Sequence, residues 1–540
     1  MFTSPWEKRR ASYDFVVVGS GYGGAITAAR LASAPLNPKP SICILERGSE
    51  RWPGNLRFPD TVDGVMEEFR SAMNPFGLYE LLNYNDISVI KGCGLGGTSL
   101  INANVAATPG AEVFDQPEWP RALHWEYLRT YFDRARSTLG AGPDPRASRF
   151  PKVAAMQRRA QELGLQAHLL DLAINFTETD TNQYGVPRRP CLGCGDCTTG
   201  CNHLSKSTLY MNYLPMARNA GAQIFTEAEV DTIDQDPSGL WRVRGRQGDT
   251  AEPFTLRAGN VILAAGSINS TEILMRSQAR GLSMSPALGT RFSCNGDFFG
   301  LAYNGQFRTQ ITGFGNHSDS PAAEYPPGPA IVSAIHYDGA RPLADRFQIE
   351  DLTIPGAFVA AARRAFAALS QDQRTDPVVR GRMRRDLDPA VAYDPDGALN
   401  HTMFYLVMGF DDARGRMVFD KSVRVVWDDA GRQPIYDRLN EELSLHAKAL
   451  DAAYLANPLW SFLEMRRLIT AHPIGGCPLG DDYTSAVVNQ WGQAFRANGD
   501  LHRGLYVADG AILPTSIGAN PFLTISALAE HIAERIIGQT

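Results

Sequence analysis

Residues 14–31 read DFVVVGSGYGGAITAARL. The apolar run at 15–18 predicts a buried strand, and the small residues that follow the glycines predict a helix packed closely against it. Gly19, Gly21 and Gly24 have the G-x-G-x-x-G spacing between these two elements. Glycines at these positions let backbone N–H groups approach a pyrophosphate at the start of a helix. Taken alone, the turn is equally compatible with tight packing and no ligand.

A second strand is predicted at 41–48, SICILERG, near an acidic residue. Glu46 lies 22 residues after Gly24, where a carboxylate can accept hydrogen bonds from the hydroxyls of an adenosine ribose. The alternative is an acid on the surface, but strand, turn, helix and acid together favour a bound dinucleotide. A crossover of this length also predicts a right-handed unit and a parallel sheet.

The same strand pattern returns far along the chain, at 260–277 and at 504–516. We therefore expect an α/β fold with a doubly wound, Rossmann-type domain that is discontinuous in sequence. The predicted boundaries of this cofactor-binding domain are 1–115, 205–300 and 466–540.

The remaining segments, 116–204 and 301–465, predict a second, α+β domain that binds the substrate. It contains aromatic and β-branched stretches, which are typical of antiparallel strands. The stretches are PAIVSAIHYD at 329–338, HTMFYLVMGF at 401–410 and RVVW at 424–427. We expect them to form an antiparallel sheet beside the cofactor.

The composition argues against several classes of protein. In 540 residues, 52 basic and 58 acidic side chains give a formal net charge of −6, which does not favour binding to nucleic acid. No secretion signal is recognised, and no apolar run approaches the roughly 20 residues of a membrane-spanning helix. A basic stretch at 378–386 follows a predicted helix at 357–370; it allows a peripheral membrane contact, but a solvated helix face is favoured.

A second glycine cluster distinguishes an FAD-binding protein from an NAD-binding one, because proteins of both kinds share the first glycine pattern. Residues 92–102, GCGLGGTSLIN, resemble the flavin-covering segment of the glucose-methanol-choline (GMC) oxidoreductases, and residues 260–277 resemble the strand and helix that this family places near the flavin. Residues 471–480, AHPIGGCPLG, and 504–530 are similar to the cholesterol-oxidase branch. The resemblance implies an FAD enzyme that oxidises an alcohol, secondary and sterol- or terpenoid-like, to a ketone or aldehyde.

The resemblance also implies which residues bind FAD. Tyr22, Gly23 and Glu46 would contact the adenosine half, and Val230 the adenine. The residues beside the flavin and its ribityl chain would be Gly97, Asn102, Val105, Asp509, Gly510 and Phe522. Pro521 suits the first turn of the last helix, because its missing N–H removes no hydrogen bond there.

Two further residues are placed by the resemblance at the reacting carbon. His472 and Asn520 would hold the alcohol and take its proton while hydride leaves for flavin N5. The alternatives are a structural histidine and an asparagine that caps the last helix. We expect Asn520 to serve both as a cap and in catalysis.

Glu350, in FQIEDLTIPGAF, lies where the cholesterol-oxidase branch carries a carboxylate that moves a proton during isomerisation of a β,γ-unsaturated ketone. A buried carboxyl with a raised pKa suits that task. A structural acid is the alternative, because the alignment around Glu350 is loose.

The eight cysteines are too few for a disulfide scaffold, which points to a reducing, cytoplasmic location. Four of them, Cys191, Cys194, Cys197 and Cys201, have the spacing of a bacterial ferredoxin loop that binds an iron–sulfur cluster. Two features weaken this interpretation: Asn202 replaces the usual proline, and in ferredoxins the fourth cysteine serves a different cluster. Zinc and reduced structural thiols are the alternatives.

The electron acceptor is left open by the sequence. Oxygen would make the enzyme an oxidase, whereas a cluster would favour a dehydrogenase that passes electrons to a carrier. Two rival functions remain: a nicotinamide-dependent dehydrogenase with the same fingerprint, and a flavin or iron–sulfur electron-transfer protein that oxidises no alcohol.

Overall fold

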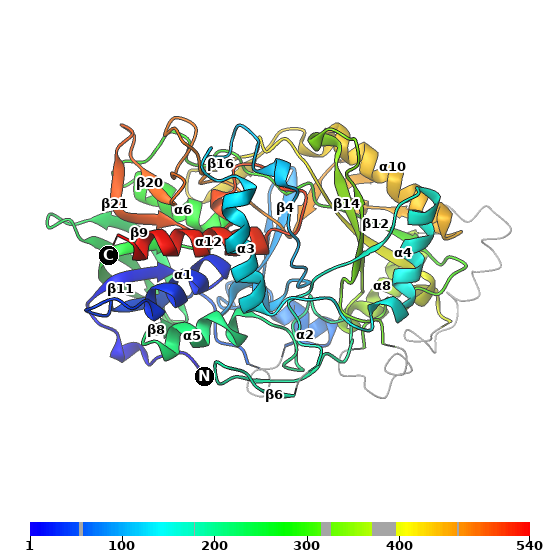
Figure 1. Cartoon of the computed structure of the whole chain (residues 1–540), viewed down its shortest axis with the longest axis horizontal. Coiled ribbons are helices and arrows are strands. Elements are labelled where there is room, and N and C mark those ends of the chain that lie inside the picture. Colours follow the sequence, from blue (N-terminus) through cyan, green and yellow to red (C-terminus); the bar gives the residue numbers. More distant parts are fainter. Residues whose placement is uncertain (53–57, 178, 315–325, 370–395, 462–463, 540) are drawn as a thin grey trace.

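The computed structural model describes residues 1–52, 58–177, 179–314, 326–369, 396–461 and 464–539. An eight-stranded sheet forms one end of the elongated molecule (Figure 1). Its strand order is β20 (Gln493–Phe495), β21 (Leu501–Val507), β11 (Glu252–Leu263), β1 (Ser12–Val18), β2 (Ile42–Leu45) and β8 (Gln223–Phe225), and β10 (Trp241–Gln247) and β9 (Ala228–Gln235) extend from β11.

The centre of this sheet is parallel, as the sequence predicts. β21, β11, β1, β2 and β8 all run in one direction. The pairing of β1 with β11 runs from Ser12 opposite Arg257 to Val18 opposite Leu263, and β1 then ends at the glycine turn. The strands come from the three segments predicted for the cofactor domain, so the discontinuous Rossmann-type sheet is confirmed.

Helices with small and apolar faces cover the sheet. α1 (Tyr22–Ser33) packs against α5 (Tyr213–Asn219) and α12 (Phe522–Ile537), and α12 packs against α3 (Trp125–Leu139). Arg30 of α1 forms an ion pair with the buried Glu530 of α12, with Nε and Oε2 2.7 Å apart. The Tyr213 hydroxyl of α5 donates to the same carboxylate at 2.7 Å, so one buried charge joins three helices. The helix α6 (Ser267–Gln278) packs against β9.

A six-stranded sheet stands at the other end of the molecule (Figure 1). Its neighbouring strands are antiparallel, in the order β18 (Ala453–Ala456), β12 (Phe298–Tyr303), β15 (Met403–Gly409), β14 (Phe347–Leu352), β13 (Ser333–Tyr337) and β5 (His168–Leu169). Packed against it are α4 (Pro151–Glu162) and α10 (Pro434–Ala449). The antiparallel sheet predicted for the substrate domain is therefore present.

A three-stranded sheet lies between these two bodies. It is formed by β3 (Tyr79–Asn83), β4 (Ile87–Gly92) and β19 (Leu468–Thr470), with β19 parallel to β4. β4 leads into the second glycine cluster, and β19 leads into the loop that holds His472. Because parallel neighbours end at the same edge, this pairing brings two distant candidate segments together.

The structure differs from the sequence prediction in three places. Residues 424–427 do not join the six-stranded sheet; β17 (Val423–Val426) pairs only with β16 (Arg416–Phe419) in a separate hairpin. β12 starts at Phe298, just before the predicted boundary at 300. α3, from a segment predicted for the substrate domain, packs against α12 of the cofactor domain.

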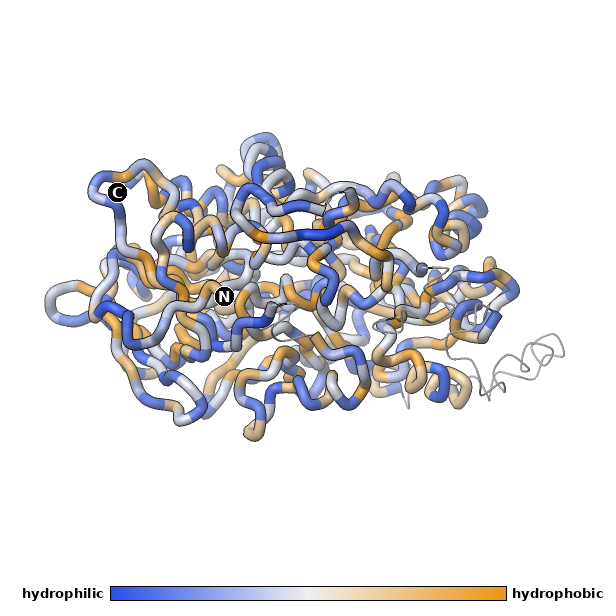
Figure 2. Tube along the Cα trace, turned by 90° about the horizontal axis from the view of Figure 1, so that it is seen from below, coloured by the Kyte–Doolittle hydropathy of each residue, from blue (hydrophilic) through white to orange (hydrophobic). Residues whose placement is uncertain are grey.

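The remaining α-helices and strands of the described chain, besides several 3-10 helices, are α2 (Val62–Glu67), α8 (Val359–Leu369), α11 (Pro458–Ser461) and the pair β6 (Asp180–Thr181) and β7 (Pro187–Arg188). The basic stretch at 378–386, which carried the alternative of a membrane contact, lies outside the described residues. Polar and apolar stretches alternate along the chain (Figure 2), and none of the described helices is long and apolar enough to cross a membrane.

One buried ion pair joins α4 to the six-stranded sheet. The Lys152 Nζ lies 2.8 Å from Asp351 Oδ2, and both side chains are fully buried. The lysine also donates to the carbonyl oxygens of Pro329 and Ala330 at 2.6 and 3.2 Å. Asp351 Oδ1 accepts from the backbone N–H of Ser333 at 2.5 Å. Removing one partner would leave the other charge buried without compensation.

We predict that Lys152→Met lowers the free energy of unfolding by about 3–5 kcal/mol, because the Asp351 carboxylate loses its counterion. Urea denaturation would measure the change. The double variant Lys152→Met/Asp351→Asn should recover part of the loss. A single variant as stable as the wild type would contradict the assigned ion pair.

Candidate active site

The first glycine turn combines tight packing with one open position. A Cβ on Gly19 would lie 2.2 Å from the carbonyl oxygen of Ala264, and one on Gly24 would lie 2.0 Å from that of Gly19. A Cβ on Gly23 would lie 2.1 Å from the Ala508 oxygen, whereas one on Gly21 meets no atom within 4 Å. Three glycines thus let the chain pack on itself, while Gly21 faces free space at the start of α1. This is the arrangement that a pyrophosphate requires.

The second glycine cluster lies directly over the first. A Cβ on Gly97 would stand 3.0 Å from the Cα of Gly21. The backbone N–H of Gly96 donates to the Ser20 hydroxyl at 2.9 Å. Gly96 and Gly97 have φ values of 110° and 56°, in the left-handed region that favours glycine. Residues 92–102 therefore close over the turn at Gly21.

Glu46 is held at the end of β2 beside this turn. Its Oε2 accepts hydrogen bonds from the N–H and the hydroxyl of Ser20 at 3.1 and 2.6 Å, and its Oε1 accepts from the Gly48 N–H at 2.8 Å. Burial raises the pKa of Glu46, against these hydrogen bonds. The Ala228 N–H at the start of β9 donates to the Glu46 carbonyl at 2.9 Å, so Val230 on β9 lies near this end of the turn.

The predicted flavin side contains polar atoms that lack a partner. Asn102 Nδ2 donates to the Tyr22 hydroxyl at 2.8 Å, and the Tyr22 ring stacks on Phe522 with centroids 4.8 Å apart. Asn102 Oδ1 and Asn104 Nδ2 are buried without a hydrogen bond to the chain. Since buried polar groups are nearly always satisfied, these atoms fit a site that a polar cofactor completes.

The remaining predicted cofactor residues border the same region. Asp509 Oδ2 accepts from the Gly266 N–H and the Ser270 hydroxyl at 2.8 and 2.5 Å, and burial raises the pKa of this carboxyl. Gly510 begins the short helix after Asp509. Val105 and Val230 are buried, and Pro521 stands immediately before α12. Close contacts link Gly21 with Gly97, Glu46 with Ser20, and Tyr22 with Asn102 and Phe522, and the contacts of all the predicted residues with FAD stay predictions.

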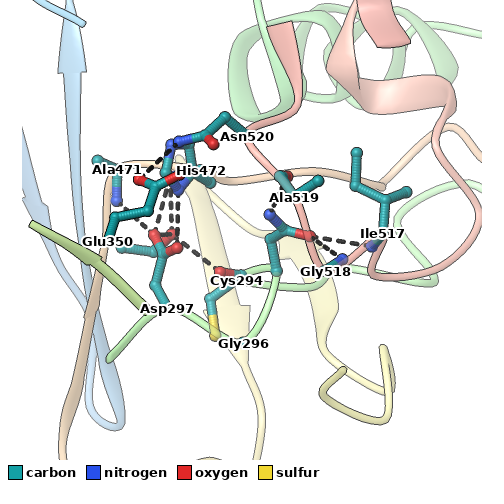
Figure 3. A network of polar contacts seen from close by, with 12 residues as sticks. Cys294, Gly296, Asp297, Glu350, Ala471, His472, Ile517, Gly518, Ala519 and Asn520 are labelled. Carbon is teal, nitrogen blue, oxygen red and sulfur yellow. Dashed lines mark hydrogen bonds and ion pairs between the residues drawn. The ribbon is translucent and has the colours of Figure 1, made fainter. Parts of the chain in front are cut away.

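His472 is oriented by a carboxylate that the sequence did not reveal. Its Nδ1 lies 2.7 Å from Asp297 Oδ1 (Figure 3). Asp297 Oδ2 accepts from the N–H groups of Ala471 and His472 at 3.0 and 3.2 Å and from the Thr470 hydroxyl at 2.7 Å. Asp297, at the start of β12, fixes the ring and leaves Nε2 as the nitrogen that can act on a substrate.

Asn520 and Glu350 form the other half of this network (Figure 3). Asn520 Nδ2 donates to Glu350 Oε2 at 3.3 Å, and Gln348 Nε2 donates to Glu350 Oε1 at 2.9 Å. Glu350 is fully buried. Burial raises the pKa of Glu350 well above its ordinary value; the Asn520 hydrogen bond opposes this shift, and the nearby Asp351 and Asp297 add to it. The neutral carboxyl is therefore favoured.

The prediction that Asn520 also caps the last helix is wrong. The residue at the N-cap of α12 is Pro521, and no side chain caps this helix. The Asn520 amide is instead committed to Glu350. Its backbone is positioned by Asn295, which donates to the Ala519 oxygen at 2.8 Å and accepts from the N–H groups of Ile517 and Gly518 at 2.9 and 3.2 Å.

Three supporting residues were therefore missed from the sequence: Asn295, Asp297 and Gln348. The only local signal for the first two is the polar run Asn295-Gly296-Asp297 before a strand. Gln348 lies two residues before Glu350 and so on the same face of β14.

Neither His472 nor Asn520 lines the cavity of the cysteine loop. Cys191, Cys194, Cys197 and Cys201 line one cavity with about 340 Å³ of empty space, part of it open to solvent. All eight cysteines are unbridged. In the described part of the chain, no group of three or more His, Cys, Asp or Glu side chains is arranged to hold a metal ion, so neither the iron–sulfur prediction nor the zinc alternative is supported by an observed set of ligands.

Comparison with known proteins agrees with this geometry. The N-terminal model of the GMC oxidoreductases matches residues 13–294, and the C-terminal model matches residues 394–529. The chain belongs to the GMC oxidoreductases. Membership makes it an FAD-dependent oxidoreductase, supports flavin-dependent oxidation of an alcohol, and removes the case for a nicotinamide enzyme or a non-enzymatic module.

Among relatives of this GMC oxidoreductase are two cholesterol oxidases. That of Mycobacterium tuberculosis is 25% identical, with 97% of this chain and 91% of the relative covered. That of Acinetobacter baumannii is 24% identical, with 96% and 93% covered. The crystal structure of pyridoxine 4-oxidase from Mesorbium loti has the same fold, with a TM-score of 0.60, 16% identity and 97% and 98% of the two chains covered.

Two substitutions in the glycine turn should separate cofactor binding from folding. We predict that Gly21→Val folds but purifies without FAD, because its side chain occupies the space for the pyrophosphate. Gly24→Ala should instead destabilise the chain, since its Cβ would lie 2.0 Å from a backbone oxygen. Flavin absorbance and thermal unfolding measure the two effects. Full flavin occupancy in Gly21→Val would overturn the assigned site.

Burial of Glu350 should also make stability depend on pH. Its pKa is raised on folding, so its contribution is complete below the pKa of about 4.3 in the unfolded chain and is lost as the pH rises through the folded pKa. We predict that the melting temperature of Glu350→Gln, relative to wild type, rises steadily above about pH 4.3. The exposed Glu7→Gln is the control. Parallel wild-type and Glu350→Gln profiles would contradict a raised pKa.

Proposed function

We propose that this protein oxidises a secondary alcohol of the sterol or terpenoid class to a ketone at FAD. The observation that carries the proposal is the His472–Asp297 contact at 2.7 Å, in a network with Asn520 and Glu350. Asn520 is two residues from Phe522, whose ring stacks on Tyr22 in the predicted flavin site. The two cholesterol oxidases among the relatives support the sterol-like substrate.

The residues of this network suit an alcohol whose carbon loses hydride. The hydroxyl would lie between His472 Nε2 and the Asn520 side chain, and His472 would take the proton as the hydride departs. Bound FAD supplies the hydride acceptor. Asp297 holds the ring through Nδ1 and stabilises the imidazolium that results. One alcohol therefore gives up a hydride and a proton and becomes a ketone or, for a primary alcohol, an aldehyde.

Glu350 supports a second step on a suitable substrate. If oxidation yields a β,γ-unsaturated ketone, Glu350 in its ionised form would take a proton from the α-carbon and return it to the γ-carbon, and the raised pKa makes that carboxylate a stronger base. The contact of Glu350 with Asn520 favours this role over that of a remote structural acid. Product analysis tests it, since Glu350→Gln should still oxidise the alcohol and accumulate the unconjugated ketone.

The electron acceptor is oxygen or an electron carrier. The oxidases among the relatives favour oxygen, and peroxide would then form with each turnover. The cysteine-lined cavity favours a carrier. Measuring peroxide against alcohol consumed distinguishes the two, and an anaerobic screen of sterols, terpenoid alcohols and short primary alcohols tests the substrate class by flavin bleaching.

We predict that His472→Ala retains FAD but reduces it about two to four orders of magnitude more slowly with alcohol under anaerobic conditions. Stopped-flow absorbance measures the rate. His168→Ala, an exposed histidine on the edge strand β5, is the control and should react at the wild-type rate. Asp297→Asn should shift the pH dependence of reduction, because Asp297 acts through the histidine. An unchanged rate in His472→Ala would exclude its catalytic role.

A further inference from the structure

The cysteine loop is built around a cavity. Gly193, Gly195 and Gly200 have φ values of 78°, 81° and 109°, so the chain turns in the left-handed region at three points between Cys191 and Cys201. These turns direct all four cysteines to one cavity, which Lys206 also lines. In the two-cluster ferredoxins the fourth cysteine of such a run leaves for another site. Here it does not.

The cavity suits a group larger than one ion. A single zinc ion needs its ligands at about 2.3 Å around one point, and no such arrangement occurs among the described residues. In a cubane cluster each thiolate binds a different iron, so the four sulfurs stand further apart around a larger body. Four unbridged cysteines that line one cavity match the second case.

The loop is fastened to the segment that covers the flavin site. The Lys206 Nζ donates to the carbonyl oxygens of Leu100, Asn102 and Cys197 at 3.0, 2.6 and 2.9 Å. Cys197 packs in one apolar cluster with Val105. One lysine therefore joins the cysteine loop to the end of the covering segment, at Leu100 and Asn102.

A second set of contacts joins the loop to the strand that carries Glu350. The Thr353 hydroxyl donates to the Gly195 oxygen at 2.6 Å, and the Gly356 N–H donates to Asp196 Oδ1 at 2.6 Å. Thr353 directly follows β14. The loop thus lies between the flavin-covering segment and the substrate sheet, and is not a remote appendage.

Cations and an N–H donor face three of the four sulfurs, whereas the Asp196 carboxylate faces Cys194. The Gly193 N–H donates to Cys191 Sγ at 3.3 Å. The Arg146 guanidinium faces Cys191, and the Lys206 ammonium faces Cys197 and Cys201. Four thiolates bound to an iron–sulfur core carry net negative charge, which these donors and cations offset.

We propose that Cys191, Cys194, Cys197 and Cys201 bind one cubane iron–sulfur cluster, which takes electrons singly from the reduced flavin. Each alcohol oxidised yields two electrons and two protons. The cluster passes the electrons one at a time to an acceptor of the ferredoxin or quinone class, and the protons are released. Cluster binding stands independently of the substrate, whereas the relay rests on the proposed alcohol oxidation.

The test begins with full-length protein purified without oxygen. We expect about four iron and four sulfide per chain, together with a paramagnetic signal after chemical reduction. Cys194→Ser should lose that signal and much of the iron. Cys43→Ala, which removes a buried cysteine of β2 far from the loop in sequence, should keep both. Protein that is free of iron, even after reconstitution with iron and sulfide, or that holds zinc without sulfide, would overturn the proposal.

The relay is tested separately from the chemistry at the flavin. In Cys194→Ser, anaerobic reduction of the flavin by alcohol should proceed at the wild-type rate, while electron transfer to ferricenium is lost. Wild-type protein that contains the cluster but whose flavin no alcohol reduces would refute the proposed function and leave the cluster site standing. Unchanged transfer to ferricenium in Cys194→Ser would refute the relay.

Discussion

The close approach of two glycine clusters is the constraint on which the site depends. Any side chain on Gly97 would stand against the Gly21 backbone, so the covering segment can lie over the pyrophosphate turn only because Gly97 lacks a Cβ. β4 delivers that segment, and its parallel partner β19 delivers His472. The three-stranded sheet therefore sets the distance between the glycine clusters of the predicted cofactor site and His472.

Features with a local pattern could be predicted from the sequence. The strand at 15–18, the glycine turn and the helix after it follow from the pattern of a few residues, and the parallel sheet follows from the length of the crossover between the first two strands. Partners of a strand are harder to predict. Residues 424–427 have the β-branched composition of the substrate sheet, yet β17 pairs with β16, because composition favours a strand without choosing its neighbour.

The supporting residues of the site escaped prediction for a related reason. Asp297 and His472 are 175 residues apart in the sequence, and no motif near Asp297 predicts their contact. Asn520 was expected to cap α12, a common role for asparagine at a helix start. Its amide instead donates to Glu350, because leaving a buried carboxyl without hydrogen bonds costs more free energy than leaving a helix uncapped. Tertiary context decided both cases.

The discontinuity of the Rossmann-type sheet bears on how the chain is made. The central strand β1 pairs with β11, some 240 residues later, and β11 pairs with β21 near the other end of the chain. Such long loops must close before these pairings are gained, which slows folding. During synthesis the glycine turn at the start of α1 is made long before α12, Asn520 and Phe522. A nascent chain that does not yet contain α12 can therefore hold no completed cofactor site, and its unpaired strand edges are exposed to aggregation until the later strands are made.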